Sequence, residues 1–331
     1  MIIQSQFTPA TGLSNTHLQT LLPTFIRSGL VFEGVQQTLE LNDGDFVDLV
    51  WTEKPGAPSA NHQAAKPIVI IFHGLEGSID SPYAKGMMLA IKAQGWIGLL
   101  MHFRGCSQSP NRLARSYHSG ETGDARQLLD WLKKHYPQHV LSAIGFSLGG
   151  NMLLKLQAEL GALSPFKAVV SVCAPLVLSA CADRLKRGFS KNYQRYLVGH
   201  LKNKLNLKAQ KHDYKTLINL SPDDIKQLKT FWQFDDLVTA PLHGFAGVED
   251  YYTRSSARQY LKNIQAPSLI ILALDDPFMT ADIIPDESEL SVCTDLELSK
   301  HGGHVGFIGG SVLNPEYWLE KRLLAYFRNY F

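Results

Sequence analysis

The residues best suited to chemistry stand in three separated segments of the chain. Ser147 lies in the stretch GFSLGG, where glycines flank it on both sides. A serine hydroxyl is a weak nucleophile near neutral pH, so it needs a base within hydrogen-bonding reach, and the base needs an acid to orient it. The pair Asp275 and Asp276 and, further on, His304 supply these residue types in the order serine, acid, histidine. This set predicts nucleophilic catalysis through a covalent intermediate.

The surroundings of Ser147 have the pattern of a nucleophile elbow. An apolar run at 140–144 precedes it, and a helix-forming stretch at 151–160 follows. A serine at the tip of a sharp strand-to-helix turn requires a strained backbone and neighbours nearly without side chains, which the glycines provide. The amide of Leu148, at the start of the helix, is expected to face the place where an oxyanion forms. A glycine-rich turn with a passive serine is the alternative.

Both partners of the serine have an alternative nearby. Adjacent residues leaving a strand point in different directions, so only one of the two aspartates can face the histidine. Asp276 is our first choice, and Asp275 is the alternative acid. In the stretch HGGH, His304 is preferred as the base because the two glycines before it allow a flexible approach to Ser147. His301, close to the end of a strand, is expected to be structural.

A second oxyanion donor is expected from the loop after an early strand. The stretch HGLEG (73–77) follows an apolar run, and the amide of Leu75 is the candidate to face that of Leu148. The sequence has no glycine-rich dinucleotide motif, no phosphate-binding loop and no cluster with metal-ligand spacing. We therefore expect neither a cofactor nor a metal.

Strands and helices alternate along most of the chain. Predicted strands are the apolar runs at 68–72, 96–103, 140–144, 169–173, 268–274 and 292–298. Predicted helices lie at 83–94, 121–135, 151–160 and 315–330. This α/β alternation favours a mostly parallel, doubly wound sheet. Two alternating runs, 38–41 and 46–51, are joined by a connector with Asp-Gly and predict an N-terminal β-hairpin.

The alternation stops between residues 175 and 262, which we predict to be a helical lid insertion within a single domain, 1–331. Residues 184–215 hold ten Lys or Arg against one acidic residue. One apolar stripe with helical spacing runs through them, at Tyr193, Leu197, Leu201 and Leu205. We favour a lid helix that packs this stripe on the core and leaves its lysines in water. Contact of 184–215 with an anionic surface is the alternative.

Two further stretches of the insertion are candidates to line a pocket beneath it. They are Phe234-Asp235-Asp236 and His243-Gly244-Phe245. Packing within the lid is the alternative for both.

Composition excludes several classes of protein. With 45% hydrophobic and 19% charged residues and a net charge of +2, the 331-residue chain has the profile of a globular protein without an obligate nucleic-acid partner. The four cysteines form no CxxC pair, and the first residues lack the pattern of a signal peptide. No apolar run approaches the roughly 18 residues of a transmembrane helix. These features favour a cytoplasmic location.

Together these motifs resemble the α/β-hydrolase superfamily, and more narrowly the bacterial YheT-like esterases related to the eukaryotic ABHD hydrolases and their plant embryogenesis-associated relatives. The matching stretches span nearly the whole chain and include SNTHLQTLLP (14–23), FHGLEGSIDSPYAKG (72–86), GFSLGGNML (145–153), LDDPF (274–278) and HGGHVGF (301–307). The resemblance implies the α/β-hydrolase fold and a serine carboxylesterase, with Ser147, Asp276 or Asp275, and His304 in the triad positions.

We therefore expect a serine carboxylic-ester hydrolase that acts through an acyl-enzyme on small-molecule acyl esters of short to medium chain length. A thioesterase or an acyltransferase would use the same triad. A non-catalytic binding protein that kept the hydrolase scaffold is the alternative of a different class.

Overall fold

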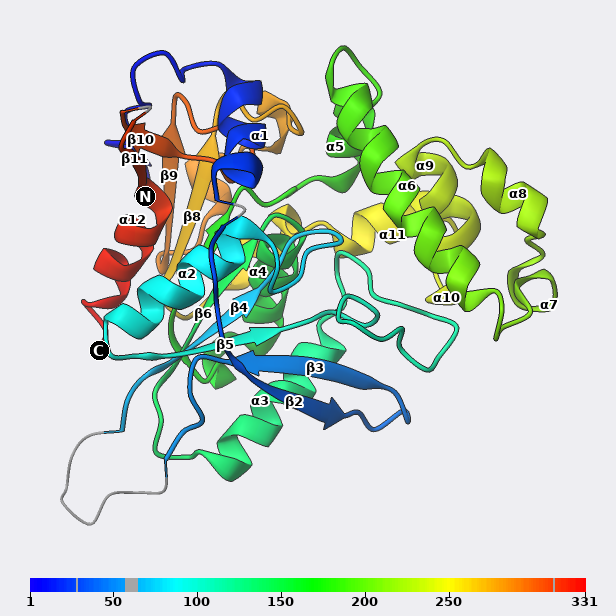
Figure 1. Ribbon diagram of the computed structural model, residues 1–331, viewed down its shortest axis with the longest axis horizontal. Coiled ribbons are helices and arrows are strands. Elements are labelled where there is room, and N and C mark those ends of the chain that lie inside the picture. Colours follow the sequence, from blue (N-terminus) through cyan, green and yellow to red (C-terminus); the bar gives the residue numbers. More distant parts are fainter. Residues whose placement is uncertain (28, 57–64, 312) are drawn as a thin grey trace.

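A single large sheet organises the chain. The computed structural model describes residues 1–331 except 28, 57–64 and 312, and in this part the sheet has nine strands in the order β1-β9-β8-β7-β6-β4-β5-β3-β2 (Figure 1). Only β3 runs antiparallel to its neighbours, β2 and β5. The strands are β1 (Ile2–Gln4), β2 (Val35–Glu40), β3 (Phe46–Trp51), β4 (Ile68–Phe72), β5 (Ile97–Met101), β6 (Leu141–Phe146), β7 (Phe166–Val172), β8 (Ser268–Ala273) and β9 (Thr294–Ser299).

Both faces of the sheet are covered by helices, as β4 shows. All five of its residues are fully buried, and successive side chains point to opposite faces. Val69 and Ile71 share a core with α2 (Pro82–Ala93) and α12 (Trp318–Phe327). The alternate residues, Ile68, Ile70 and Phe72, share a second core with α3 (Gly123–His135). Continuous apolar runs therefore mark strands buried on both sides, as the sequence predicts.

The predicted elements differ from the observed ones mainly at their ends. The hairpin of β2 and β3 is confirmed, but β2 begins at Val35 and β3 also pairs with β5, so the hairpin is the edge of the main sheet. The predicted helix at 315–330 begins only at Trp318, because Pro315–Tyr317 forms β11 against β10 (Ile308–Gly310). Strands of three residues, including β1, carry too short a pattern to be predicted.

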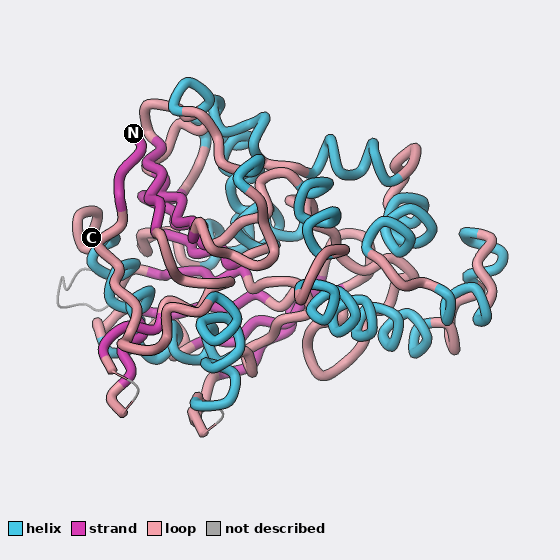
Figure 2. Tube along the Cα trace, turned by 90° about the horizontal axis from the view of Figure 1, so that it is seen from above, coloured by secondary structure: helices cyan, strands magenta, loops and turns pink. Residues whose placement is uncertain are grey.

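A run of helices lies between β7 and β8 and projects beyond the ends of the strands (Figures 1 and 2). They are α5 (Leu178–Leu185), α6 (Ser190–Lys208), α7 (Tyr214–Ile218), α8 (Pro222–Gln227), α9 (Phe231–Phe234), α10 (Ala240–Leu242) and α11 (Val248–Ser255). The predicted stripe on α6 packs inward: Tyr193 and Leu205 are buried, and Leu197 and Leu201 are partly buried against the same cores. None of the described helices is both long and apolar enough to span a bilayer.

Candidate active site

Three side chains from distant segments meet at the carboxyl edge of the sheet. Nε2 of His304 lies 2.9 Å from Oγ of Ser147, and Nδ1 lies 2.8 Å from Oδ2 of Asp276. A carboxylate can only accept, so Nδ1 of His304 carries the proton and donates it to Asp276. In the neutral ring, Nε2 therefore accepts a hydrogen bond from the Ser147 hydroxyl. Of the residues predicted from the sequence, the structure brings Ser147, His304 and Asp276 into one hydrogen-bonded row.

The backbone at Ser147 is strained, as the elbow pattern predicts. Ser147 follows β6 directly and has a φ of 50°, a left-handed conformation that a residue with a side chain rarely adopts. A Cβ atom added at Gly149 would lie 2.3 Å from the carbonyl oxygen of Phe72. At Gly145, it would lie 2.4 Å from the carbonyl oxygen of Gly149. Only glycine fits at either position, and the hydroxyl of Ser147 consequently stands at the start of α4 (Leu148–Leu160).

The two adjacent aspartates have different partners. Asp276 is buried, and its second oxygen, Oδ1, accepts the Phe278 N–H at 2.8 Å. Asp275 turns the other way: its Oδ1 accepts the N–H of Gly303 at 3.0 Å, and its Oδ2 is 3.5 Å from Nδ1 of His301. Burial raises the pKa of Asp275. Asp275 and His301 thus shape the loop that carries His304, while Asp276 contacts the imidazole itself.

The ring of His304 is also held from one face. Phe278 stacks on it with ring centroids 4.0 Å apart and planes 7° from parallel. Thr20 of α1 (Thr16–Ile26) accepts the backbone N–H of His304 at 3.0 Å. These contacts hold the ring and the backbone of His304 from two separate segments.

The loop after β4 lies directly beside the serine. A Cβ atom at Gly74 would be 3.2 Å from Cβ of Ser147. His73 is fully buried, which lowers its pKa to about 3; its Nε2 accepts the N–H of Phe103, so Nδ1 donates to the Gly74 carbonyl at 2.7 Å. Among the described residues, neither the Leu75 nor the Leu148 N–H has a hydrogen-bond acceptor. Both amides are therefore available to a ligand.

A pocket of about 150 Å³ opens beside Ser147 and His304. Its walls are largely apolar side chains of the helical insertion, among them Leu178, Leu185, Leu197, Leu201, Phe231 and Val238. Of the two predicted pocket-lining stretches, Phe234, Asp235 and His243 do line it. Such a concave apolar site with few polar groups is typical of small-molecule binding.

Burial shifts the pKa values of three ionisable groups in this pocket toward their neutral forms. Burial raises the pKa of Asp235 to about 6, and its oxygens accept hydrogen bonds from Thr239 and Tyr252. Burial also lowers the pKa of His118 to about 3 and that of His243 to about 2. The two imidazoles are therefore neutral near pH 7, whereas Glu76 and Lys204, which also line the pocket, form an ion pair.

His118, Glu121 and His243 place three ligand-type atoms close together. However, Nδ1 of His118 accepts the N–H of Gly120 at 3.1 Å, so the proton of the neutral ring sits on Nε2. That nitrogen, which faces Glu121, has no lone pair for a metal. The Glu121 carboxylate is in turn bound by Arg115. As arranged, the cluster suits hydrogen bonding better than metal binding.

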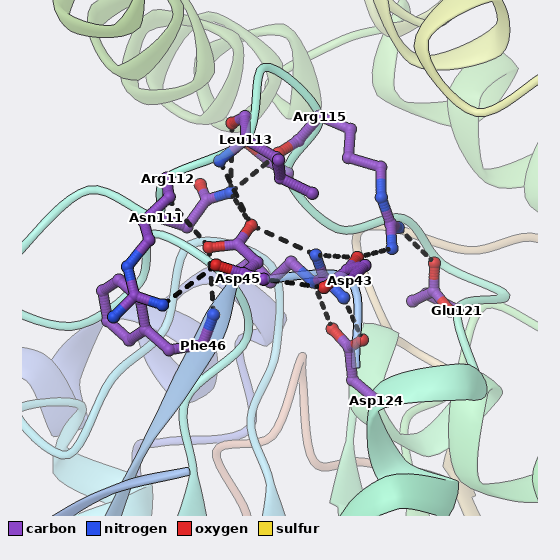
Figure 3. Close-up of polar contacts among 12 residues, drawn as sticks. Asp43, Asp45, Phe46, Asn111, Arg112, Leu113, Arg115, Glu121 and Asp124 are labelled. Carbon is purple, nitrogen blue, oxygen red and sulfur yellow. Dashed lines mark hydrogen bonds and ion pairs between the residues drawn. The ribbon is translucent and has the colours of Figure 1, made fainter. Parts of the chain in front are cut away.

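The pocket loop that carries Tyr117 and His118 is anchored by a buried charge cluster (Figure 3). Arg104, 1% exposed, donates to both oxygens of Asp124 at 2.6 and 2.7 Å, and to Asp43 and Asp45 at 2.7 and 3.1 Å. Burial alone would raise the pKa of Asp43, but the hydrogen bonds from Arg104 and Arg115 lower it to about 2. Sequence reasoning missed this cluster, because its members have no common local pattern.

Comparison with known proteins places these features in context. Residues 67–311 match the family profile described as "alpha/beta hydrolase fold". The chain is 47% identical over 326 residues to "Putative esterase YheT" of Escherichia coli (strain K12), covering 98% of this chain and 94% of that protein. It is 25% identical over 313 residues to "Phospholipase ABHD3" of Bos taurus, covering 93% and 75% of the two.

A solved structure of the Pyrococcus furiosus esterase Pf2001 has the same fold. It matches with a TM-score of 0.55 and 15% sequence identity, covering 100% of this chain and 98% of that one. At this identity the likeness concerns the arrangement of strands and helices alone.

Proposed function

Because this chain belongs to the α/β-hydrolase family, we propose that it is a serine carboxylic-ester hydrolase that acts through an acyl-enzyme. The observation that carries the proposal is the hydrogen-bonded row in which His304 contacts Ser147 at 2.9 Å and Asp276 at 2.8 Å. This is the geometry that a serine needs in order to lose its proton as it attacks.

In the first half of the reaction, Oγ of Ser147 attacks the ester carbonyl carbon and its proton moves to Nε2 of His304. Asp276 stabilises the imidazolium through Nδ1–H. The carbonyl oxygen becomes an oxyanion and accepts the N–H groups of Leu75 and Leu148, the latter at the positive end of α4. When the tetrahedral intermediate collapses, the C–O bond to the alcohol breaks and His304 returns the proton to that alcohol.

In the second half, a water attacks the acyl-enzyme. His304 takes a proton from this water, the oxyanion forms again at the same two amides, and the bond to Ser147 breaks. The serine recovers its proton from His304 and the carboxylic acid leaves. Every proton is carried by His304, so this mechanism requires neither a cofactor nor a metal.

Covalent labelling tests the mechanism. A fluorophosphonate probe should label the wild-type protein, and Ser147→Ala should abolish both labelling and hydrolysis of p-nitrophenyl esters while the melting temperature stays close to that of the wild type. Absence of Ser147-dependent labelling would instead favour the non-catalytic binding protein. Faster turnover of acyl thioesters than of oxygen esters, or transfer to an added alcohol, would favour a thioesterase or an acyltransferase.

For the substrate, we propose short- to medium-chain acyl esters, which the apolar pocket of about 150 Å³ suits. A series of p-nitrophenyl esters from acetate to palmitate should show a maximum of kcat/KM at intermediate length. A rise continuing to palmitate would contradict this assignment. A cytoplasmic location is also proposed, because all four cysteines are free thiols in the structure; recovery with the periplasmic fraction of cells would oppose it.

For residues 184–215, we propose a weak contact with anionic lipid that is confined to the start of α6. Lys204 and Lys208 point into the protein, whereas Arg187, Lys191 and Arg195 are exposed. Phe189, close to them in the chain, is 50% exposed. Basic and apolar side chains on one surface are the pattern of interfacial binding.

The neighbouring helix α1 continues this surface. Its residue His17 lies against Phe189, with ring centroids 4.3 Å apart. The helix has no Lys, Arg, Asp or Glu, and Leu18 and Leu21 are 45% and 38% exposed. The protein should sediment with phosphatidylglycerol vesicles at low salt, and a Phe189→Ser, Lys191→Glu variant should not. Failure of the wild type to sediment at low salt would end this proposal.

A further inference from the structure

The loop that carries the Leu75 amide is tied to the helical insertion by an ion pair. Lys204 lies on α6, and its Nζ atom is 3.0 Å from both Oε1 and Oε2 of Glu76. Glu76 follows Leu75 directly, 128 residues before Lys204 in the chain. Both side chains line the pocket together with Ser147. The pair therefore joins the insertion to one of the two proposed oxyanion donors.

Glu76 occupies a position where its residue type is unfavourable. The N–H of Gly77 donates to the carbonyl of Gly74 at 3.0 Å, which closes a β-turn with Leu75 and Glu76 at its centre. Glu76 has a φ of 55°. Turns with a left-handed residue at this third position normally place glycine or asparagine there, and a left-handed residue with a longer side chain is strained unless its surroundings hold it. The contacts of Glu76 supply that restraint.

Tyr117 holds the backbone of Glu76. Its hydroxyl accepts the Glu76 N–H at 2.8 Å and donates to Oε1 of the same residue at 2.8 Å. Tyr117 is itself buried and stacks on Phe103, with ring centroids 5.1 Å apart. The Lys204 ammonium binds the Glu76 carboxylate, so Tyr117 and Lys204 together form a clamp on Glu76. The ammonium also donates to Sγ of Cys106 at 3.0 Å. Glu76 is thus fixed through its backbone on one side and through its carboxylate on the other.

The ion pair also changes the electrostatic potential at the proposed oxyanion site. The Glu76 side chain is only 6% exposed, so water screens its carboxylate poorly. A negative charge one residue from an oxyanion donor would oppose the charge that develops in the transition state. The Lys204 ammonium, in contact with both carboxylate oxygens, offsets this repulsion.

We propose that Lys204 is a positioning residue for the hydrolysis: through Glu76 it holds the 74–77 turn with the Leu75 N–H directed at the oxyanion, and it cancels the carboxylate charge beside it. The inference rests on the proposed function. One consequence is that the oxyanion site is complete only while α6 lies over the pocket. Movement of the insertion away from the sheet would break the pair and weaken turnover.

Four variants and one control test this role. Lys204→Met removes the ammonium and leaves the carboxylate uncompensated, whereas Glu76→Gln removes the charge but keeps a hydrogen-bonding group of the same shape. The double variant combines the two, and Lys204→Arg keeps the positive charge. The control is Lys229→Met, which changes an exposed lysine of the same insertion.

The expected result is a fall in kcat with KM nearly unchanged. Removal of one oxyanion donor costs about 10²–10³ in kcat, so loosening it in K204M should cost about 10- to 100-fold. E76Q should lose less, and the double variant, which lacks the tie to the turn but also lacks the uncompensated charge, should lie between E76Q and K204M. K204R should retain most activity, and K229M should match the wild type. A K204M with wild-type kcat, or with a raised KM alone, would overturn the proposal.

Amide hydrogen exchange gives a readout that needs no activity. In a Ser147→Ala background, K204M should speed exchange in the peptide that contains residues 74–77, and K229M should not. Unchanged exchange would refute the clamp even if kcat fell. If the wild type hydrolysed no ester, the proposed function would fail while this measurement still decided whether Lys204 holds the turn. E76Q, the most conservative change, keeps the test available if K204M does not fold.

Discussion

His304 and Asp276 share a hydrogen bond of 2.8 Å, while the neighbouring Asp275 binds the amide of Gly303. Replacement of Asp276 by asparagine should therefore lower kcat by about 10⁴, because the amide cannot hold His304 in the tautomer that accepts the serine proton. Asp275→Asn keeps an oxygen that can accept the Gly303 N–H and loses only the charge beside His301, so its kcat should fall by about tenfold at most. Steady-state hydrolysis of p-nitrophenyl butyrate measures kcat for both variants. Equal losses in the two variants would contradict this assignment of the acid.

A second prediction concerns the packing of the elbow. Gly149→Ala places a Cβ atom 2.3 Å from the Phe72 carbonyl oxygen, a backbone atom that cannot move aside. The variant should lose at least about 1–3 kcal/mol in the free energy of unfolding, together with its activity. Gly199→Ala is the matched control, because nothing lies within 4 Å of its added Cβ and it sits inside α6; it should gain about 0.5–1 kcal/mol. Urea denaturation compares the two, and a G149A as stable as the wild type would be inconsistent with this packing.

The third prediction concerns Arg104. Its guanidinium is completely buried and binds Asp43, Asp45 and Asp124. Arg104→Met leaves Asp45 and Asp124 without a counter-charge, although Asp43 keeps its pair with Arg115. Breaking a buried pair typically costs about 3–5 kcal/mol. Arg112→Met is the control, because Arg112 pairs with Glu40 at the surface with 49% of its side chain exposed, where a pair contributes about 0–1 kcal/mol. Similar urea midpoints for the two variants would show that the cluster does not stabilise the fold.

The fourth prediction is a pH dependence that arises from Lys208. Its ammonium donates to Oδ1 of Asn111, Oγ of Ser116 and the Arg115 carbonyl, and no carboxylate of the residues that the structure describes lies within salt-bridge distance of it. Burial, together with nearby positive charges that include Arg104, lowers the pKa of Lys208 to about 7. In the unfolded chain the pKa is about 10.4.

The sign follows from proton binding. Between pH 7 and about 10 the unfolded chain binds more protons at Lys208 than the folded protein does, so this group makes the free energy of unfolding rise with pH. In Lys208→Met, the free energy of unfolding from urea denaturation should rise less with pH across this range, or fall more steeply, than in the wild type. Lys211→Met, at an exposed position, should keep the wild-type slope. Parallel curves for K208M and the wild type would rule out a neutral Lys208 in the folded protein.

Local patterns in the sequence were sufficient for the framework of the site. The glycines around Ser147 are required by contacts within the elbow itself, so GFSLGG predicts the turn without knowledge of the rest of the fold. Continuous apolar runs mark strands such as β4 because both of its faces are buried, and the two glycines before His304 favoured it over His301 for a local reason. In each case the information lies within about ten neighbouring residues.

The tertiary structure decided which side chains from distant segments meet. Asp275 and Asp276 are alike in sequence, and only the path of the chain after β8 turns Asp276 toward His304. Arg104 with its three carboxylates, and Lys204 with Glu76, join segments far apart in the chain. A pair of this kind leaves no periodic pattern in either segment, because each charge looks like an ordinary surface residue until folding brings its partner to it and removes the water between them.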